Sequence, residues 1–236
     1  MEALAHAPHA VRKVFLAPEV NDRELRDLLR KKNLSPGVLK GGEMDRVVGR
    51  DTVHQGVIAV TDPGALMMDF KQFMATLNPS SETMLVLLDE LTDPHNVGAI
   101  IRSAAGFGAA GVLIPEHNQA PITGTVVKTS AGMAFRVPLV SIGNVNQAVD
   151  ALQREGFRTY GLVMNGPQNI AEERFDAPAL FIVGNEGEGI REKTLERCDV
   201  KLRIPMDART ESLNASVSAA VVLYQWSVRH PGALGK

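Results

Sequence analysis

The chain has 236 residues, which is enough for one large domain or two small ones. Its composition, 44% apolar and 22% charged, is that of an ordinary globular protein and excludes an intrinsically disordered chain. The net charge of −2 argues against a protein that coats nucleic acid by charge alone.

Membrane, secreted and zinc proteins are also disfavoured. No apolar run reaches the roughly 20 residues that a membrane span needs, and the first residues, MEALAHAPHAVRK, lack the pattern of a secretory signal. The single cysteine, Cys198, cannot form an internal disulfide, so we expect a cytoplasmic protein. With no HExxH or CxxC pattern, we expect no zinc site.

Residues 1–75 have the pattern of a small α/β domain. Strands are expected at 11–17, 37–40 and 56–60, and Asn21 and Glu24 have capping-box spacing before an apolar helical stripe. The apolar stretch that ends this region predicts a connecting helix or an extended arm. The polar, proline-containing residues 76–82 predict a linker.

From residue 83 to residue 236 strands alternate with helices, which predicts a parallel sheet covered on both faces. A helix is expected to open at Asp93-Pro94, with Asp93 as N-cap. The expected strands are residues 84–90, 111–115, 135–140, 157–164, 179–184 and 200–206, and the other expected helices are residues 122–130, 145–156 and 212–230.

Three segments could carry chemistry. In DPHNVGAIIRSAAGFG (93–108), Asn96 lies in the first helical turn, near a strand's carboxyl end, where α/β proteins bind ligands. Arg102 lies in an otherwise apolar stretch, so it either pairs with a buried acid or reaches toward an anion, and the two readings are about even.

The other two segments follow later strands. FIVGNEGEGI (181–190) has a GxxGxG pattern, which fails the dinucleotide fingerprint, and read alone it is more often a flexible turn. In RIPMDARTESLNASVSAA (203–220), Ser212 has the type of a helix N-cap, and the small residues after it permit close packing against another helix or subunit. Asn214 has no evident role on such a helix.

Read together and in this order, the motifs NxGAIxRSA (96–104), GNEGxG (184–189) and IPM with SLNxSV (204–217) resemble those of the SpoU (TrmH-like) RNA ribose 2′-O-methyltransferases. Residues 83–236 resemble the knotted (trefoil) parallel-sheet SPOUT methyltransferase domain. Residues 1–75 resemble the small L30e-like α/β substrate-binding domain of the branch that methylates 23S rRNA guanosines. Relative to that domain the chain begins late, so its first element is expected to be truncated.

The resemblance implies S-adenosylmethionine as the cofactor, held in a pocket formed by the knot. The implied cofactor-binding residues are Gly184, Asn185, Ser130, Ile204, Met206, Leu213 and Asn214. For catalysis the resemblance implies Arg102, with Asn96, Glu186, Ser212 and Asn214 positioning it and the ribose. Because a guanidinium is not expected to lose its proton, we favour Arg102 as the ligand of the neighbouring RNA phosphate.

The resemblance also implies a homodimer and an RNA partner, 23S rRNA or else tRNA. Basic side chains in the first domain are candidates for phosphate contacts, although for any one of them a solvated charged face is the more common explanation: Arg12, Lys13, Arg23, Arg26, Arg30, Lys31 and Lys32. Two rivals remain outside this chemistry. A non-catalytic RNA-binding or ribosome-assembly protein would be favoured by loss of Asn96 or Arg102, and a dinucleotide-dependent oxidoreductase would need GxGxxG.

Overall fold

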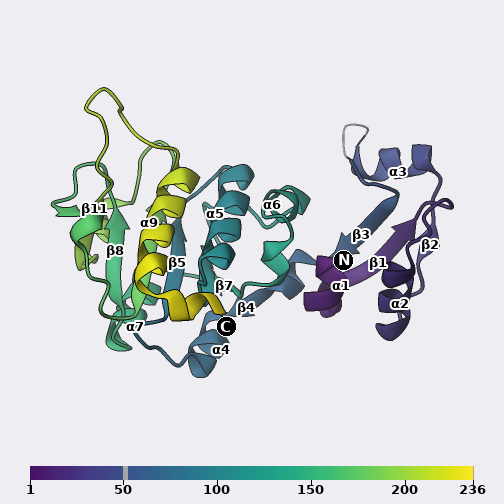
Figure 1. The fold of residues 1–236 in the computed structure, drawn as a ribbon, viewed down its shortest axis with the longest axis horizontal. Coiled ribbons are helices and arrows are strands. Elements are labelled where there is room, and N and C mark those ends of the chain that lie inside the picture. Colours follow the sequence, from purple (N-terminus) through teal and green to yellow (C-terminus); the bar gives the residue numbers. More distant parts are fainter. Residues whose placement is uncertain (50–52, 236) are drawn as a thin grey trace. The chain divides into compact units, whose positions relative to one another are not determined.

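The computed structural model describes residues 1–49 and 53–235, which form two compact units, Met1–Leu66 and Met67–Lys236 (Figure 1). The boundary therefore differs from the expected one at residue 75. Residues 67–76 belong to the second unit because they add a strand and a helix to its sheet. The polar residues 76–82 lie inside the second unit, between that helix and the next strand.

The first unit has the expected α/β character. Its elements are α1(Glu2–His6), β1(Val11–Leu16), α2(Arg23–Lys31), β2(Gly37–Val38), α3(Gly41–Val48) and β3(Val57–Thr61), with short 3₁₀ turns at Pro8–Ala10 and Pro63–Leu66. The three strands form one sheet in the order β2-β1-β3, in which β1 runs parallel to β2 and antiparallel to β3.

The helix α2 begins one residue later than the capping-box spacing predicts. Its N-cap is Asp22, whose carboxylate accepts the backbone N–H of Leu25 at 3.0 Å, and not Asn21. A carboxylate at this position accepts a hydrogen bond from a free N–H group, and its negative charge interacts favourably with the positive end of the helix dipole. The helix buries Leu25 and Leu29, as its apolar stripe predicts.

The second unit is built on a parallel sheet, as its alternating pattern predicts. Its strands are β4(Met67–Asp69), β5(Met84–Asp89), β6(Gly111–Pro115), β7(Leu139–Ile142), β8(Arg158–Leu162), β9(Gln168–Asn169), β10(Ala179–Gly184) and β11(Val200–Arg203). Among the described residues they form one eight-stranded sheet in the order β4-β7-β6-β5-β10-β8-β11-β9, with every neighbouring pair parallel.

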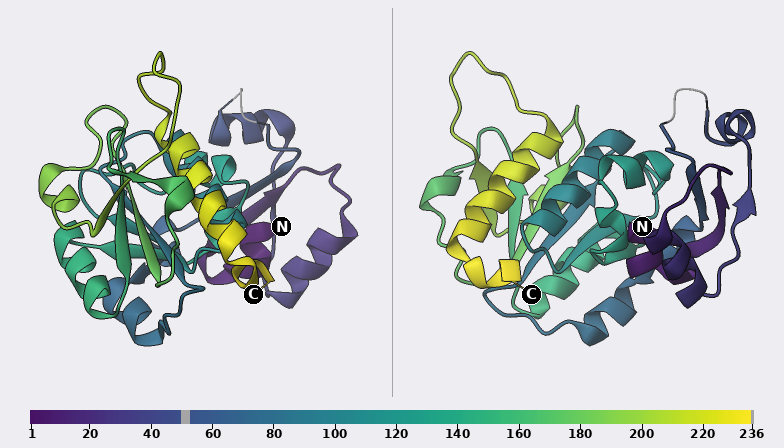
Figure 2. Two further views of the ribbon diagram at one scale, coloured as in Figure 1. Left: turned by 60° about the vertical axis from the view of Figure 1, so that its left-hand side comes forward. Right: turned by 45° about the vertical axis from the view of Figure 1, so that its right-hand side comes forward.

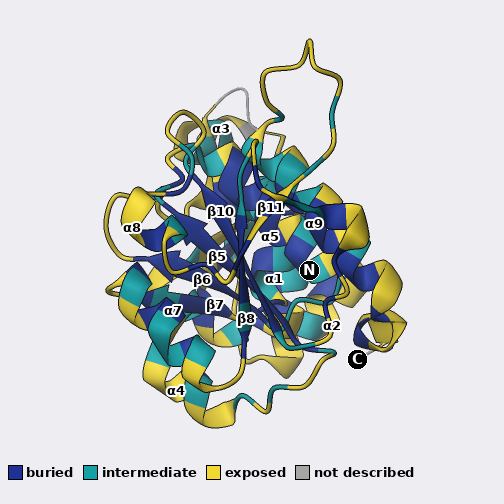
Figure 3. Cartoon of the chain, turned by 90° about the vertical axis from the view of Figure 1, so that its left-hand side faces the viewer, coloured by how far each residue is buried: buried dark blue, intermediate teal, exposed yellow. Residues whose placement is uncertain are grey.

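Helices cover both faces of this sheet. They are α4(Phe70–Thr76), α5(Pro94–Gly106), α6(Gly124–Thr129), α7(Val145–Arg154), α8(Glu192–Leu195) and α9(Ala215–Arg229), with 3₁₀ turns at Met133–Phe135, Ile170–Glu172 and Pro231–Gly235. Helices α5, α6 and α9 lie on one face, and α4, α7 and α8 lie on the other (Figures 1 and 3). The central strands β5, β6 and β10 are buried along their whole length, which explains their continuous apolar sequence.

Several expected boundaries are wrong. The strand expected at 200–206 ends at Arg203, and two further differences have local reasons. The strand predicted at 135–140 begins only at Leu139, because Met133–Phe135 forms a 3₁₀ turn and Pro138 has no N–H to give to the sheet. The last helix begins at Ala215 and not at 212, because its N-cap is Asn214.

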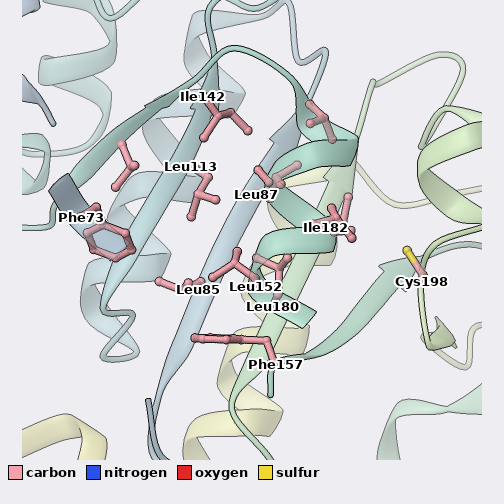
Figure 4. Close-up of a cluster of buried hydrophobic side chains, with 14 of the residues drawn as sticks. Phe73, Leu85, Leu87, Leu113, Ile142, Leu152, Phe157, Leu180, Ile182 and Cys198 are labelled. Atoms are coloured by element: carbon pink, nitrogen blue, oxygen red, sulfur yellow. The ribbon is translucent and has the colours of Figure 1, made fainter. Parts of the chain in front are cut away.

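One core cluster joins the sheet to α7 and α4 (Figure 4). Leu85, Leu87, Leu180 and Ile182 reach it from neighbouring strands, and Leu152 reaches it from α7. Cys198 lies at the edge of this cluster, where burial raises the pKa of its thiol to about 12. A thiol that stays protonated at neutral pH is a poor nucleophile, so Cys198 acts as a small core residue.

Within residues 1–49 and 53–235, none of the helices has the length and apolar character that crossing a membrane requires.

Candidate active site

The candidate site lies where the carboxyl ends of β5 and β10 meet. Strands β5 and β10 are direct neighbours in the sheet. After β5 the chain continues to β6, and after β10 it continues to β11, which lies in the opposite direction along the strand order. Loops that diverge in this way leave a crevice between them, which is the usual ligand site of an open α/β sheet. All three motifs singled out in the sequence start or end at this edge.

The loop after β10 is a tight hairpin held by its own backbone and by one side chain. Asn185 and Gly189 exchange two backbone hydrogen bonds of 2.9 and 3.0 Å. The side-chain amide of Asn185 donates to the carbonyl of Glu90 at 2.7 Å, and its oxygen accepts the N–H of Gly187 at 2.8 Å. The loop is therefore a fixed structure, which corrects its reading as a flexible turn.

Gly184 makes this hairpin possible. A Cβ built on Gly184 would lie 2.2 Å from the backbone nitrogen of Ile190 and 2.3 Å from the carbonyl carbon of Gly189. Since both are backbone atoms, they cannot move aside without opening the loop. Gly189 contributes differently, because its φ of +75° is a conformation that other residues rarely adopt.

An ion pair that involves a buried carboxylate at the base of the loop was not predicted from the sequence. Asp89, the last residue of β5, is completely buried and accepts three hydrogen bonds from Arg191, two from its guanidinium at 2.6 and 2.9 Å and one from its backbone N–H at 3.0 Å. Arg191 also pairs with Glu90 at 3.0 Å. The sequence did contain one signal for this pair: Asp89 ends an otherwise apolar strand, and an acid buried in such a place needs a cationic or hydrogen-bonding partner.

A chain of side-chain hydrogen bonds joins the three motifs. Asn96, which is 6% exposed, donates to Glu186 at 3.0 Å and accepts from the side-chain amide of Asn214 at 2.9 Å. The oxygen of Asn214 accepts the backbone N–H of Ser216 at 2.8 Å and so caps α9. Glu186 also accepts the backbone N–H of Asp93 at 3.3 Å. The one side-chain amide of Asn96 therefore holds Glu186, which is 90 residues away in the sequence, and Asn214, which is 118 residues away.

Ser212 is not the N-cap of α9, contrary to the sequence expectation. Asn214 takes that position because its amide can cap the helix with the oxygen and bond Asn96 with the nitrogen. A serine side chain has a single oxygen and no separate amide nitrogen, so it cannot use two different atoms for these two bonds. Ser212 instead lines the cavity described next.

A cavity of about 440 Å³ opens beside this network. Its walls come from the ends of β8 and β10, the hairpin after β10, and the loop that leads into α9, which projects from the sheet (Figure 2). Of the predicted cofactor-binding residues, those that line the cavity are Gly184, Asn185, Ile204, Met206 and Leu213. Glu186 and Glu188 also border it, and the remaining wall is largely apolar.

Two of the predicted cofactor-binding residues lie elsewhere. Ser130 is completely buried next to α6, where its hydroxyl donates to the carbonyl of Val127 at 2.9 Å, and it is not among the residues that line the cavity. Asn214 acts through the network with Asn96, while its neighbours Leu213 and Ala215 provide the wall.

Arg102 is exposed on α5, and no hydrogen bond or ion pair of its side chain occurs within residues 1–49 and 53–235. The alternative of a buried structural arginine with an acidic partner is therefore wrong. On the same helix Asn96 points inward to the network and Arg102 points outward. The guanidinium is free to bind an external anion.

Comparison with known proteins gives a consistent result. The model of the family described as the SpoU rRNA Methylase family matches residues 83–224. A 23S rRNA (guanosine-2′-O-)-methyltransferase, RlmB of Pseudomonas putida, is 32% identical over 225 residues, which cover 94% of this chain and 90% of that protein. An uncharacterized tRNA/rRNA methyltransferase of Mycoplasma pneumoniae is 35% identical over 73% of this chain and 72% of its own length.

Solved structures show the same fold. The SpoU methyltransferase AviRb from Streptomyces viridochromogenes, in complex with the cofactor AdoMet, superposes with a TM-score of 0.82 at 24% identity, covering 98% of this chain and 87% of that one. A putative RNA methyltransferase of the TrmH family from Porphyromonas gingivalis gives a TM-score of 0.70 at 26% identity, covering 97% and 86%.

Replacing Gly184 with alanine tests the packing of the hairpin. We expect Gly184→Ala to lower the free energy of unfolding by about 2 kcal/mol or more, because the added Cβ meets backbone atoms that cannot give way. Gly187→Ala is the matched control, since its Cβ would lie 3.5 Å from the nearest atom. Urea unfolding measures both. Equal effects of the two substitutions would contradict the packing argument.

Proposed function

The chain belongs to the SpoU rRNA Methylase family, and on that premise we propose that it methylates a ribose 2′-hydroxyl in structured RNA. The proposed substrate is a guanosine of 23S rRNA, and the proposed methyl donor is S-adenosylmethionine. The substrate follows RlmB of Pseudomonas putida, which is similar over 94% of this chain. A ribosomal substrate places the reaction in the cytoplasm, with which the unpaired Cys198 is consistent.

The single observation that carries this proposal is the hydrogen-bond chain from Glu186 through Asn96 to Asn214. It brings the family's three motifs together at one edge of the sheet, directly beside the cavity. A non-catalytic RNA-binding protein on the same fold would have no need for both features at once, a network that positions the start of α5 and an arginine on α5 without an internal partner in the described chain.

The cavity fits an adenosyl group. Its volume of about 440 Å³ lies within the range of small-ligand sites. Apolar side chains, including Ile204 and Leu213, can cover a flat base, and the hairpin offers backbone polar groups. A Cβ built on Gly189 meets no atom within 4 Å, so the backbone there borders open space. Bound at this place, the cofactor would supply an electrophilic methyl group on a sulfonium.

Arg102 is proposed to bind the RNA phosphate next to the target ribose. The 2′-hydroxyl is a poor nucleophile and must lose its proton during attack. Because a guanidinium stays protonated, the phosphate held by Arg102 is the better proton acceptor. Asn96, Glu186 and Asn214 are proposed to position the start of α5, and with it Arg102, while Ser212 at the cavity wall orients the ribose.

We propose that the chain of the second unit is knotted as in SPOUT methyltransferases. In support, β10 inserts between β5 and β8, and β11 inserts between β8 and β9, so the last third of the chain returns into the middle of the sheet. We also propose that the first unit is the L30e-like substrate-binding domain. Its mixed three-stranded sheet with helices agrees with that assignment.

RNA contacts from the first unit are proposed to use the cations that remain free. Arg12 pairs with Asp62, whose pKa it holds below the ordinary value, and Arg30 pairs with Asp27 at 3.1 Å. Arg23, Lys31 and Lys32 on or beside α2 are exposed. These three are therefore better candidates for phosphate contacts than Arg12 or Arg30.

A homodimer is proposed to form through α9. Four side chains, spaced by one or two helical turns, lie exposed on this helix: Val217, Val221, Tyr224 and Val228, which are 46%, 37%, 56% and 57% exposed. A row of apolar side chains along one helix is unusual on a monomer and marks an interface. Tyr224 also packs edge-on against Phe107 at the end of α5, so the row adjoins the helix that carries Arg102.

The direct test of the proposed function is transfer of labelled methyl from S-adenosylmethionine to 23S rRNA and, separately, to tRNA, followed by nucleoside analysis. We expect a 2′-O-methylguanosine from 23S rRNA. Label found only in tRNA would retain the chemistry and overturn the substrate. Absence of label from both RNAs, with the cofactor bound, would favour the non-catalytic protein.

Arg102→Ala separates catalysis from cofactor binding. We expect the methylation rate to fall by at least about a hundredfold, which is typical when a charged group at the reacting centre is lost. Cofactor affinity, measured by calorimetry, should stay within about twofold, because Arg102 is not among the residues that line the cavity. Parallel loss of cofactor binding and activity would show that Arg102 belongs to the cavity instead.

Val221→Glu tests the proposed dimer face. A carboxylate in the middle of the apolar row cannot be buried without a partner, so we expect the wild-type dimer to become a monomer in sedimentation or light-scattering measurements. Val60→Glu, on an exposed strand position of the first unit, is the control and should leave the dimer intact. A wild-type chain that is monomeric at micromolar concentration would refute the proposal.

A further inference from the structure

The segment between Asp93 and Asp150 is almost free of negative charge. Acidic residues make up 27 of the 236 residues, yet the 56 residues from 94 to 149 contain one, Glu116. The same segment contains Arg102, Lys128 and Arg136. In a protein of net charge −2 this bias is local, and it covers α5 and α6 entirely.

Helices α5 and α6, which carry Arg102 and Lys128, pack directly against each other. A Cβ on Gly98 of α5 would lie 2.7 Å from Cβ of Thr129 and 2.9 Å from the carbonyl oxygen of Val126, so the two helices touch at backbone distance. His95 and Arg102 are seven residues apart and therefore share a face of α5. Both are exposed, and Nδ1 of His95 lies 3.4 Å from Oγ1 of Thr129.

Helix α6 adds a second cation to this surface. Val126 is buried, whereas Thr125 and Lys128, three residues apart, are exposed on the opposite side of the helix. The ammonium of Lys128 has no hydrogen bond or ion pair to any other described residue. We call the surface formed by His95, Arg102, Thr125 and Lys128 the α5–α6 face.

Three acids on or beside the elements around the α5–α6 face form hydrogen bonds with neutral groups and no ion pair with Arg102 or Lys128. Asp93 caps α5 by accepting the backbone N–H of His95 at 2.8 Å. Glu186 is bound by Asn96, and Glu116 accepts the hydroxyl of Ser141 at 2.9 Å. Two exposed cations that form no ion pair within the described residues favour a ligand with repeated negative charge.

We propose that the α5–α6 face binds the RNA backbone on one side of the target nucleotide, with Lys128 as a second phosphate ligand beside Arg102. This inference rests on the proposed function, because it extends the RNA path from Arg102 across α6. Two cations on adjacent helices can contact successive phosphates, while the hydroxyl of Thr125 and the ring of His95 offer hydrogen bonds to phosphate or sugar. Contacts of this kind position the RNA and do not read its sequence.

The test is the affinity of the full-length protein for in vitro transcribed, unmodified 23S rRNA at several KCl concentrations. For Lys128→Gln we expect about three- to tenfold weaker binding and a salt dependence reduced by roughly one phosphate contact. Lys128→Arg should bind as the wild type does. Cofactor affinity should not change, since Lys128 does not line the cavity.

Lys71→Gln is the matched control, because Lys71 is an exposed lysine on α4, which covers the opposite face of the sheet. It should leave RNA affinity and its salt dependence unchanged. If Lys128→Gln binds RNA with wild-type affinity and salt dependence while the wild type methylates the RNA, the inference is wrong and the proposed function stands. If Lys128→Gln alone weakens binding but no RNA is methylated, the α5–α6 face stands and the proposed reaction fails.

Discussion

The site depends on a single buried amide. Asn96 uses its nitrogen for Glu186 and its oxygen for Asn214, and these two bonds offset the cost of burying its amide. Three segments that are distant in sequence, the start of α5, the hairpin after β10 and the start of α9, are therefore held at one point. The cavity wall follows, because the hairpin and the loop before α9 form most of it. If the amide were lost, these two loops would keep their local hydrogen bonds but lose their common anchor.

The two sides of helix α5 have different roles: one side holds the site together, and the other presents Arg102 to solvent. Its inward side carries Asn96 into the network, and Gly98 allows α6 to approach closely. Its outward side presents Arg102 to solvent, free of internal partners in the described chain. An arginine that was paired inside the protein would be unavailable to a phosphate. The ion pair of Arg191 with the buried carboxylate of Asp89 is the contrasting case, in which an arginine is bound inside the protein and fixes the base of the hairpin.

Much of the fold follows from sequence pattern. The apolar runs at 84–90, 111–115 and 179–184 predicted strands that are buried on both faces, and the structure confirms them as β5, β6 and β10 in a parallel sheet. The errors arose where tertiary contacts decide. Met67–Asp69 looked like part of an arm, but it pairs with β7 and moves the boundary between the units. Asn214 replaced Ser212 as N-cap because a partner 118 residues away completes its amide. Neither β7, the partner of Met67–Asp69, nor Asn96, the partner of Asn214, can be identified from the local sequence.

The site was predictable only as separate parts. The sequence identified Asn96, Glu186 and Asn214 individually, but their mutual bonds require the strand order, which places β10 beside β5. The pair of Asp89 and Arg191 was missed because the acid at the end of β5 signals that it needs a partner, but the sequence does not show that the partner lies 102 residues away. Ser130 was assigned to the cavity, yet it lies buried beside α6.

The most direct test of the central claim is a double-mutant cycle on Asn96 and Asn214. The free energies of unfolding of Asn96→Ala, Asn214→Ala and the double variant are compared with that of the wild type, with Ser212→Ala as a neighbouring control. The account predicts a coupling energy of about 1 kcal/mol between the two asparagines and almost no effect of Ser212→Ala. Additive effects of the two asparagines would contradict it, because the three motifs would then be held independently of their shared amide.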